Sequence, residues 1–149
     1  MDLKKLTEKL PYKWRVQSFS KNKAAASCVA YIDARDVQDR LDTVCWSENW
    51  QVKYEEHKGN LFASIGIKCW EGWTWKSDCG SESAVEKEKW EASDAFKRAA
   101  VMWGIGRFLY SLSIEYVDSN EKKTASNDPY VVSGGKRVWD ITKLINNKK

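Results

Sequence analysis

This chain of 149 residues has very little histidine and no closely spaced pair of cysteines. His57 is its single histidine, and its four cysteines are irregularly spaced with no Cys-x-x-Cys pair: Cys28, Cys45, Cys69 and Cys79. A zinc site needs grouped ligands of these two types. We therefore expect no metal centre and reduced, structural cysteines.

Long apolar runs and catalytic motifs are missing as well. No stretch has the apolar run of a signal peptide or of a membrane span, so we expect a cytosolic protein with no membrane partner, in the bacterial host cytosol if the protein is phage-encoded. There is no Gly-x-x-x-x-Gly-Lys-Ser/Thr loop for an ATP motor, and no spaced carboxylate cluster typical of a metal nuclease. Gly104-Ile105-Gly106 follows a predicted helix and lacks a third glycine, so it suits a helix end better than a dinucleotide-binding loop. The sequence favours a protein that is not an enzyme and that uses no cofactor.

Tryptophan, by contrast, is abundant, with nine residues. Stacking of indole rings on nucleic-acid bases is one use for such a surplus. The alternative for any one of them is burial in the core or a contact between subunits, where aromatic residues are enriched. The net charge of +4 favours an anionic partner without requiring one, because attraction to phosphate depends on how the cations cluster.

The length of 149 residues indicates a single domain over residues 1–149, and hydrophobic periodicity predicts the α+β class. We expect a short helix over residues 2–10, a strand pair at 12–17 and 28–32 around a polar loop at 18–26, and a helix from the N-cap Asp33 to about residue 45. An antiparallel β-meander of three strands follows between residues 50 and 78, with turns near 58–60 and 71–72. A long amphipathic helix over about 84–104 backs its apolar face.

Signals weaken after residue 112. Residues 120–128 are polar, and Ser133-Gly134-Gly135 marks a turn. The apolar residues between positions 138 and 145 suit either a final strand or a final helix.

The stretch from Glu91 to Tyr110 carries the most specific pattern. At about 100° per residue, one stripe of this helix is apolar and consists of Ala92, Phe96, Ala99 and Trp103. Lys97 and Arg98 fall on the opposite half, where Asp94 can pair with Arg98. Cations on a rigid helix suit phosphate, because Arg98 offers a planar fork and Lys97 a point charge. From these residues alone, a solvated face with a salt bridge is the simpler interpretation.

This helix, preceded by Glu86-Lys87-Glu88-Lys89, resembles the signature helix of the Rad52/Rad22-like (DdrA-like) family of single-strand annealing proteins. Four earlier blocks resemble those of the family in the same order: Trp14-Arg15-Val16-Gln17, Ala30-Tyr31-Ile32, Val37-Gln38-Asp39-Arg40-Leu41-Asp42 and Glu48-Asn49-Trp50. The resemblance covers roughly residues 10–112 and leaves 113–149 as a carboxy-terminal extension. The short chain suggests a phage or bacterial member.

The resemblance also implies a set of DNA-binding residues. It implies that single-stranded DNA binds at the Lys97-Arg98 pair, and that Arg15, at the basic position of the first block, is also a groove residue. The eukaryotic branch often has a further arginine where this chain has Val101. The absence of that arginine implies either that the DNA-binding groove holds single-stranded DNA less tightly in this chain, or that Arg107 or a strand lysine supplies the missing charge. Three strand lysines are second-rank candidates for the groove floor or an outer site, although each alone suits a solvated strand: Lys53, Lys68 and Lys76.

By the same resemblance, we expect ATP-independent binding and annealing of single-stranded DNA in homologous recombination and double-strand break repair. The family assembles as a homo-oligomeric ring with an outer groove for one strand. A single-strand binding protein or an exonuclease would be a natural partner. The alternatives are a protein that binds and protects single strands or DNA ends without annealing, a nucleic-acid enzyme, and a purely structural interaction protein.

Overall fold

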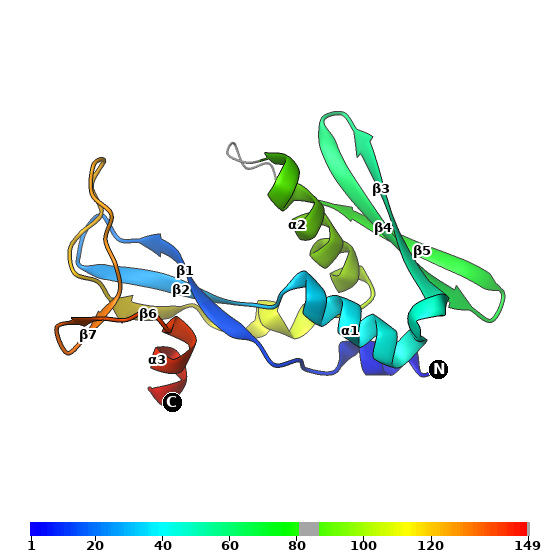
Figure 1. Ribbon diagram of the computed structural model, residues 1–149, viewed down its shortest axis with the longest axis horizontal. Coiled ribbons are helices and arrows are strands. Elements are labelled where there is room, and N and C mark those ends of the chain that lie inside the picture. Colours follow the sequence, from blue (N-terminus) through cyan, green and yellow to red (C-terminus); the bar gives the residue numbers. More distant parts are fainter. Residues whose placement is uncertain (81–86, 149) are drawn as a thin grey trace. The chain divides into compact units, whose positions relative to one another are not determined.

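The computed structural model of the chain describes residues 1–80 and 87–148, which form two compact units (Figure 1). Unit 1 comprises Met1–Leu10 and Ile32–Phe108, and unit 2 comprises Pro11–Tyr31 and Leu109–Lys149. The expected α+β class is confirmed, with an antiparallel meander, a long helix behind it and a shorter helix after the first strand pair. No helix in the described part of the chain has both the length and the apolar character needed to cross a membrane.

The sheet of unit 1 consists of β3 (Trp50–His57), β4 (Asn60–Cys69) and β5 (Gly72–Cys79), with β4 in the centre. Its first turn is at Lys58 and Gly59, whose φ angles of 52° and 80° suit a two-residue hairpin. On β4, Ala63, Ile65 and Ile67 are fully buried, so the predicted apolar face is confirmed.

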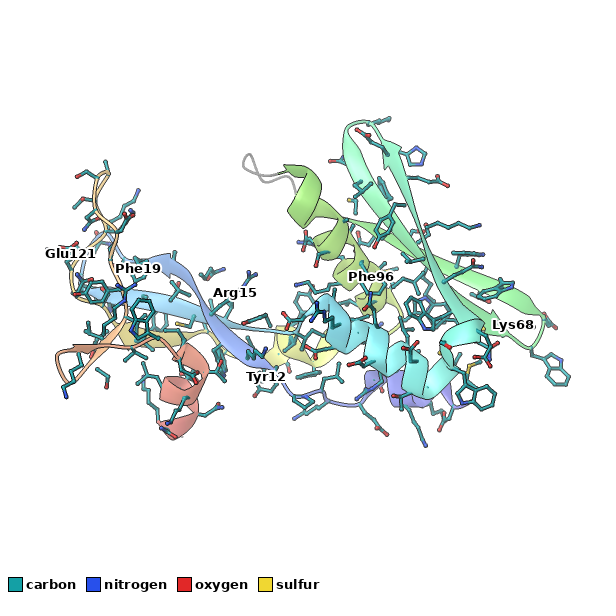
Figure 2. The ribbon with its side chains drawn as sticks, viewed as in Figure 1. Tyr12, Arg15, Phe19, Lys68, Phe96 and Glu121 are labelled. Carbon is teal, nitrogen blue, oxygen red and sulfur yellow. The ribbon has the colours of Figure 1, made fainter. Side chains whose placement is uncertain are left out.

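The long helix α2 (Lys87–Met102) lies along the apolar face of this sheet (Figures 1 and 2). Small residues on its buried side, Ala95 and Ala99, allow a close approach, and the Phe96 ring lies 6.2 Å from that of Trp50 on β3. The chain leaves the helix at Gly104 with a φ of 96°, which confirms the predicted left-handed end. The predicted start near residue 84 lies outside the described residues.

The helix α1 (Ala34–Cys45) begins after Asp33, as predicted, and the Asp33 N–H donates to the Asp36 carboxylate at 2.8 Å. Arg40 holds the amino-terminal segment against it by donating to the Lys5 and Glu8 carbonyls at 3.0 and 2.7 Å. The expected amino-terminal helix is the short 3-10 helix η1 (Leu3–Thr7), with Leu6 fully buried. A second 3-10 turn, η2 (Ser47–Asn49), leads from α1 into β3.

Unit 2 is built on a second sheet of β1 (Lys13–Phe19), β2 (Ala25–Tyr31) and β6 (Glu115–Asp118). The polar loop predicted at 18–26 is shorter, because β1 and β2 continue pairing through Phe19 and Ala26. The strand β6 was not predicted; it has four residues, of which only Val117 is buried, opposite Ala26. The 3-10 turn η3 (Arg107–Ser111) precedes this strand.

The carboxy-terminal residues complete unit 2. The predicted turn at Gly134 and Gly135 is confirmed between β7 (Val132–Ser133) and β8 (Lys136–Arg137). The last element is the helix α3 (Ile141–Asn147). The sequence left open whether this segment forms a strand or a helix, and the structure has the helix. It packs on β1, where the Trp14 N–H donates to the Thr142 hydroxyl at 2.9 Å, and its Ile145 joins the same apolar cluster as Trp14.

Candidate nucleic-acid interface

The tryptophans of the described residues lie in buried, half-buried and exposed environments. Trp14 is buried, and two half-buried indoles use their N–H groups inside unit 1: Trp50 donates to Asp42 at 2.7 Å and Trp103 to the Ile65 carbonyl at 3.0 Å. Among the described side chains, four more tryptophans are exposed, from 40% for Trp73 to 100% for Trp70: Trp46, Trp70, Trp73 and Trp139. Core packing therefore accounts for only part of the tryptophan content.

The α2 cation pair, Lys97 and Arg98, is half-buried and held by contacts within unit 1. Lys97 Nζ donates to the Ile32 carbonyl at 3.3 Å. Arg98 Nε lies 3.4 Å from the Asp94 carboxylate, one turn earlier, as the spacing predicted, with side chains 42% and 39% exposed. An ion pair so open to solvent contributes only some tenths of a kcal/mol, roughly. A phosphate can therefore replace Asp94 as the partner of Arg98 at small cost.

Two further predicted cations, Lys76 and Arg107, meet at the carboxy-terminal end of α2. Lys76 Nζ lies 3.3 Å from the Met102 carbonyl and 4.6 Å from the Trp103 ring centroid, and Arg107 donates to the Val101 carbonyl at 2.8 Å. The last carbonyls of a helix carry partial negative charge, so these cations stabilise the helix end. Their part in DNA binding stays a prediction.

Arg15 is exposed on β1 of unit 2 (Figure 2). Its guanidinium carbon lies 5.4 Å from the centroid of the Tyr31 ring on β2. Contact with a ring uses the face of the guanidinium and leaves its N–H groups directed along the edge, where they suit a phosphate.

The remaining candidates, Lys53 and Lys68, share the face of the β3–β4–β5 sheet that is opposite to α2, called the outer face below. Cross-strand partners point to the same side, and Lys68 pairs with Trp73 while Lys53 pairs with Ser64. Lys76 is on the α2 side of this sheet, beside Ile65. Trp73 and Trp75 were not among the predicted site residues, although their Trp-x-Trp spacing places both on one face of a strand.

The cysteines are poor candidates for chemistry. Burial raises the pKa of the Cys45 thiol to about 11, with the nearby Cys69 adding to the rise, and burial raises the pKa of Cys28 as well. Both thiols are therefore neutral near pH 7, and the thiolate is the reactive form. Within residues 1–80 and 87–148, no three His, Cys, Asp or Glu side chains are grouped so that they could hold a metal ion.

Comparison with known proteins adds a family match. Residues 1–128 match a family described as Rad52/22 family double-strand break repair protein, a longer region than the 10–112 of the sequence analysis. A protein of Deinococcus deserti named single-stranded DNA-binding protein DdrA is 36% identical over 118 residues, 78% of this chain and 58% of the relative. Its namesake in Deinococcus radiodurans is 34% identical over 112 residues, 74% of this chain and 53% of the relative. The chain thus spans a little more than half the length of these curated relatives, and no solved structure matches it significantly.

Proposed function

The chain belongs to the Rad52/22 family of double-strand break repair proteins, and on that basis we propose that it binds single-stranded DNA and anneals complementary strands without ATP. The names of its two relatives support the binding. The observation that carries the proposal in this chain is the α2 cation pair, Lys97 and Arg98, on a helix whose opposite side is packed on a sheet. The packing keeps both cations at fixed positions, which suits repeated contacts to a phosphate backbone.

The proposed mechanism uses no bond chemistry. Arg98 exchanges Asp94 for a phosphate, and Lys97 adds a second charge. Arg15, on unit 2, is proposed as a phosphate contact in its own right. Neutralising phosphates releases counterions and holds the strand extended with its bases accessible. A complementary strand then pairs with these bases, and duplex stacking of roughly 1.4 kcal/mol per step favours the product.

Assembly into a homo-oligomeric ring is part of the proposal. One subunit contacts few nucleotides, whereas linked copies raise the effective concentration of each further contact. Exposed aromatic side chains such as Trp46 and Trp139, 59% and 77% exposed, are the kind of surface that subunit contacts bury. An exonuclease that produces single strands in a bacterial or phage-infected cell is the partner class that would supply the substrate.

The test is annealing of two complementary fluorescent oligonucleotides without ATP or magnesium. We expect the wild type to accelerate annealing, and Lys97→Ala with Arg98→Ala to remove that acceleration. The double variant should weaken single-strand binding about 10-fold or more. It should also lower the slope of log K against log salt by about 1.4, since each phosphate contact of a single strand contributes about 0.7.

Lys4→Ala with Lys5→Ala is the matched control, because it removes the same charge from exposed positions of η1. Equal affinity of the α2 variant and this control, with both folded, would reject the α2 assignment. Strand binding without acceleration would favour the alternative, a protein that protects single strands or ends, which Val101 in place of an arginine would suit. No salt-sensitive binding at all would reject both functions.

A further inference from the structure

Two indole rings lie side by side on the outer face. Trp73 and Trp75 occupy alternate positions of β5, and their ring centroids are 6.2 Å apart with the planes inclined by 29°. Trp73 is 40% exposed and Trp75 is half-buried. Exposed aromatic rings of this size on a sheet face are how many proteins hold the bases of a single strand.

The Trp75 ring lies flat on the backbone of β4. It is the cross-strand neighbour of Gly66, and a Cβ atom placed on Gly66 would stand 2.8 Å from three carbons of the indole. With one side of the ring against the sheet, the opposite side carries the Lys53 ammonium, 4.4 Å from the ring centroid. The strand backbone thus holds this ring at a fixed height and angle.

A lysine lies beside each of the two rings. Lys53 and Lys68 are both exposed, and Lys68 is the cross-strand partner of Trp73. The acidic side chain that β3 adds to this face, Glu55, lies toward the β3–β4 turn, where it contacts His57 at 3.0 Å. Lysine is depleted at the centre of protein–protein interfaces, so rings flanked by lysines fit a polyanion better than a protein surface.

We propose that the outer face is a base-stacking platform for single-stranded nucleic acid, with Trp73 and Trp75 as the stacking residues and Lys53 and Lys68 as the phosphate contacts. The platform rests on the proposed function and adds to it a binding site on the opposite side of the sheet from α2. When a base covers Trp75, the Lys53 ammonium leaves the ring and moves to a neighbouring phosphate. The platform reads no sequence, because every base offers a flat face.

The test compares fluorescent oligo-dT with an abasic oligonucleotide of the same length, by anisotropy. The two strands carry the same phosphates, so only stacking distinguishes them. We expect Trp73→Leu to weaken binding of oligo-dT about 5-fold or more and to leave binding of the abasic strand within about 2-fold. Trp73→Phe should show a smaller loss, whereas Lys53→Ala with Lys68→Ala should weaken binding of both strands.

Trp70→Leu is the matched control, because Trp70 is a fully exposed tryptophan at the β4–β5 turn. Equal affinities for oligo-dT in Trp73→Leu and Trp70→Leu would overturn the platform, as would a wild type that does not distinguish the two strands. A lower mass of Trp73→Leu by light scattering without DNA would overturn it in favour of a subunit contact. Failure of the proposed function is a separate result, namely no salt-sensitive binding of either strand by the wild type.

Discussion

Gly66 lies in the middle of the central strand β4, where its backbone does not adopt the positive φ that requires glycine. The requirement comes instead from across the strand pair, because the Trp75 indole occupies the space in which a side chain would lie. An aromatic ring that covers a strand glycine compensates for the side chain that the glycine lacks. The local sequence therefore does not explain this residue, and its cross-strand partner does.

Gly66→Ala should lower the free energy of unfolding by about 1–3 kcal/mol, because the added methyl group forces the ring off the strand. In a Trp75→Ala background the same change should cost little. Urea denaturation of both single variants and the double variant measures this coupling. Additive losses would show that the ring does not rest on Gly66 in solution.

The predictions for the site residues also differed in how far the sequence alone could make them. The contact between Arg98 and Asp94 followed from their spacing on one helix and is confirmed. The positions of Lys53, Lys68 and Lys76 did not follow, because their sides of the sheet depend on the register between strands. A shift of one residue would exchange the two faces.

At the scale of elements, α2 depends on its carboxy-terminal end. Lys76 from β5 and Arg107 from the turn after the helix both donate to its last carbonyls, and Gly104 lets the chain turn away. A side chain at Gly104 would also meet the Thr7 methyl group at 2.6 Å. The end of the helix is therefore held by Lys76 from a strand distant in sequence and by Arg107 from the turn that follows the helix, with Thr7 packed close to Gly104.

Arg107→Ala should lower the free energy of unfolding by about 1 kcal/mol, because it removes a charged donor from the helix carbonyls. Thermal unfolding checks this, with Arg35→Ala as the control, since Arg35 is an exposed arginine in the first turn of α1. A loss of DNA affinity at unchanged stability would instead assign Arg107 to the DNA interface.

At the scale of the whole molecule, the chain crosses three times between its two units. The β1–β2 pair belongs to the same unit as the carboxy-terminal residues, and β6 and α3 supply its third strand and part of its core. The extension after residue 112 is thus part of the structure of unit 2. We keep the single-domain organisation over residues 1–149 as a proposal.

Light scattering of the purified protein should give the mass of a large oligomer, with and without DNA. The expectation comes from the proposed ring, because a site that contacts few nucleotides gains affinity through linked copies. A clean monomer under both conditions would contradict the ring. Single-strand binding and the base-stacking platform on the outer face would still be tested by their own experiments.

The sequence by itself determined the type and approximate bounds of most elements before residue 112, since helical and strand periodicity, the Asp33 cap and the glycine turns are local signals. It also placed the α2 cation pair opposite an apolar stripe. Only the tertiary structure decided the register of the meander, the pairing of β6 with β2, and the contact of Lys76 with the end of α2. These features depend on contacts between residues far apart in the chain, and no local pattern carries that information.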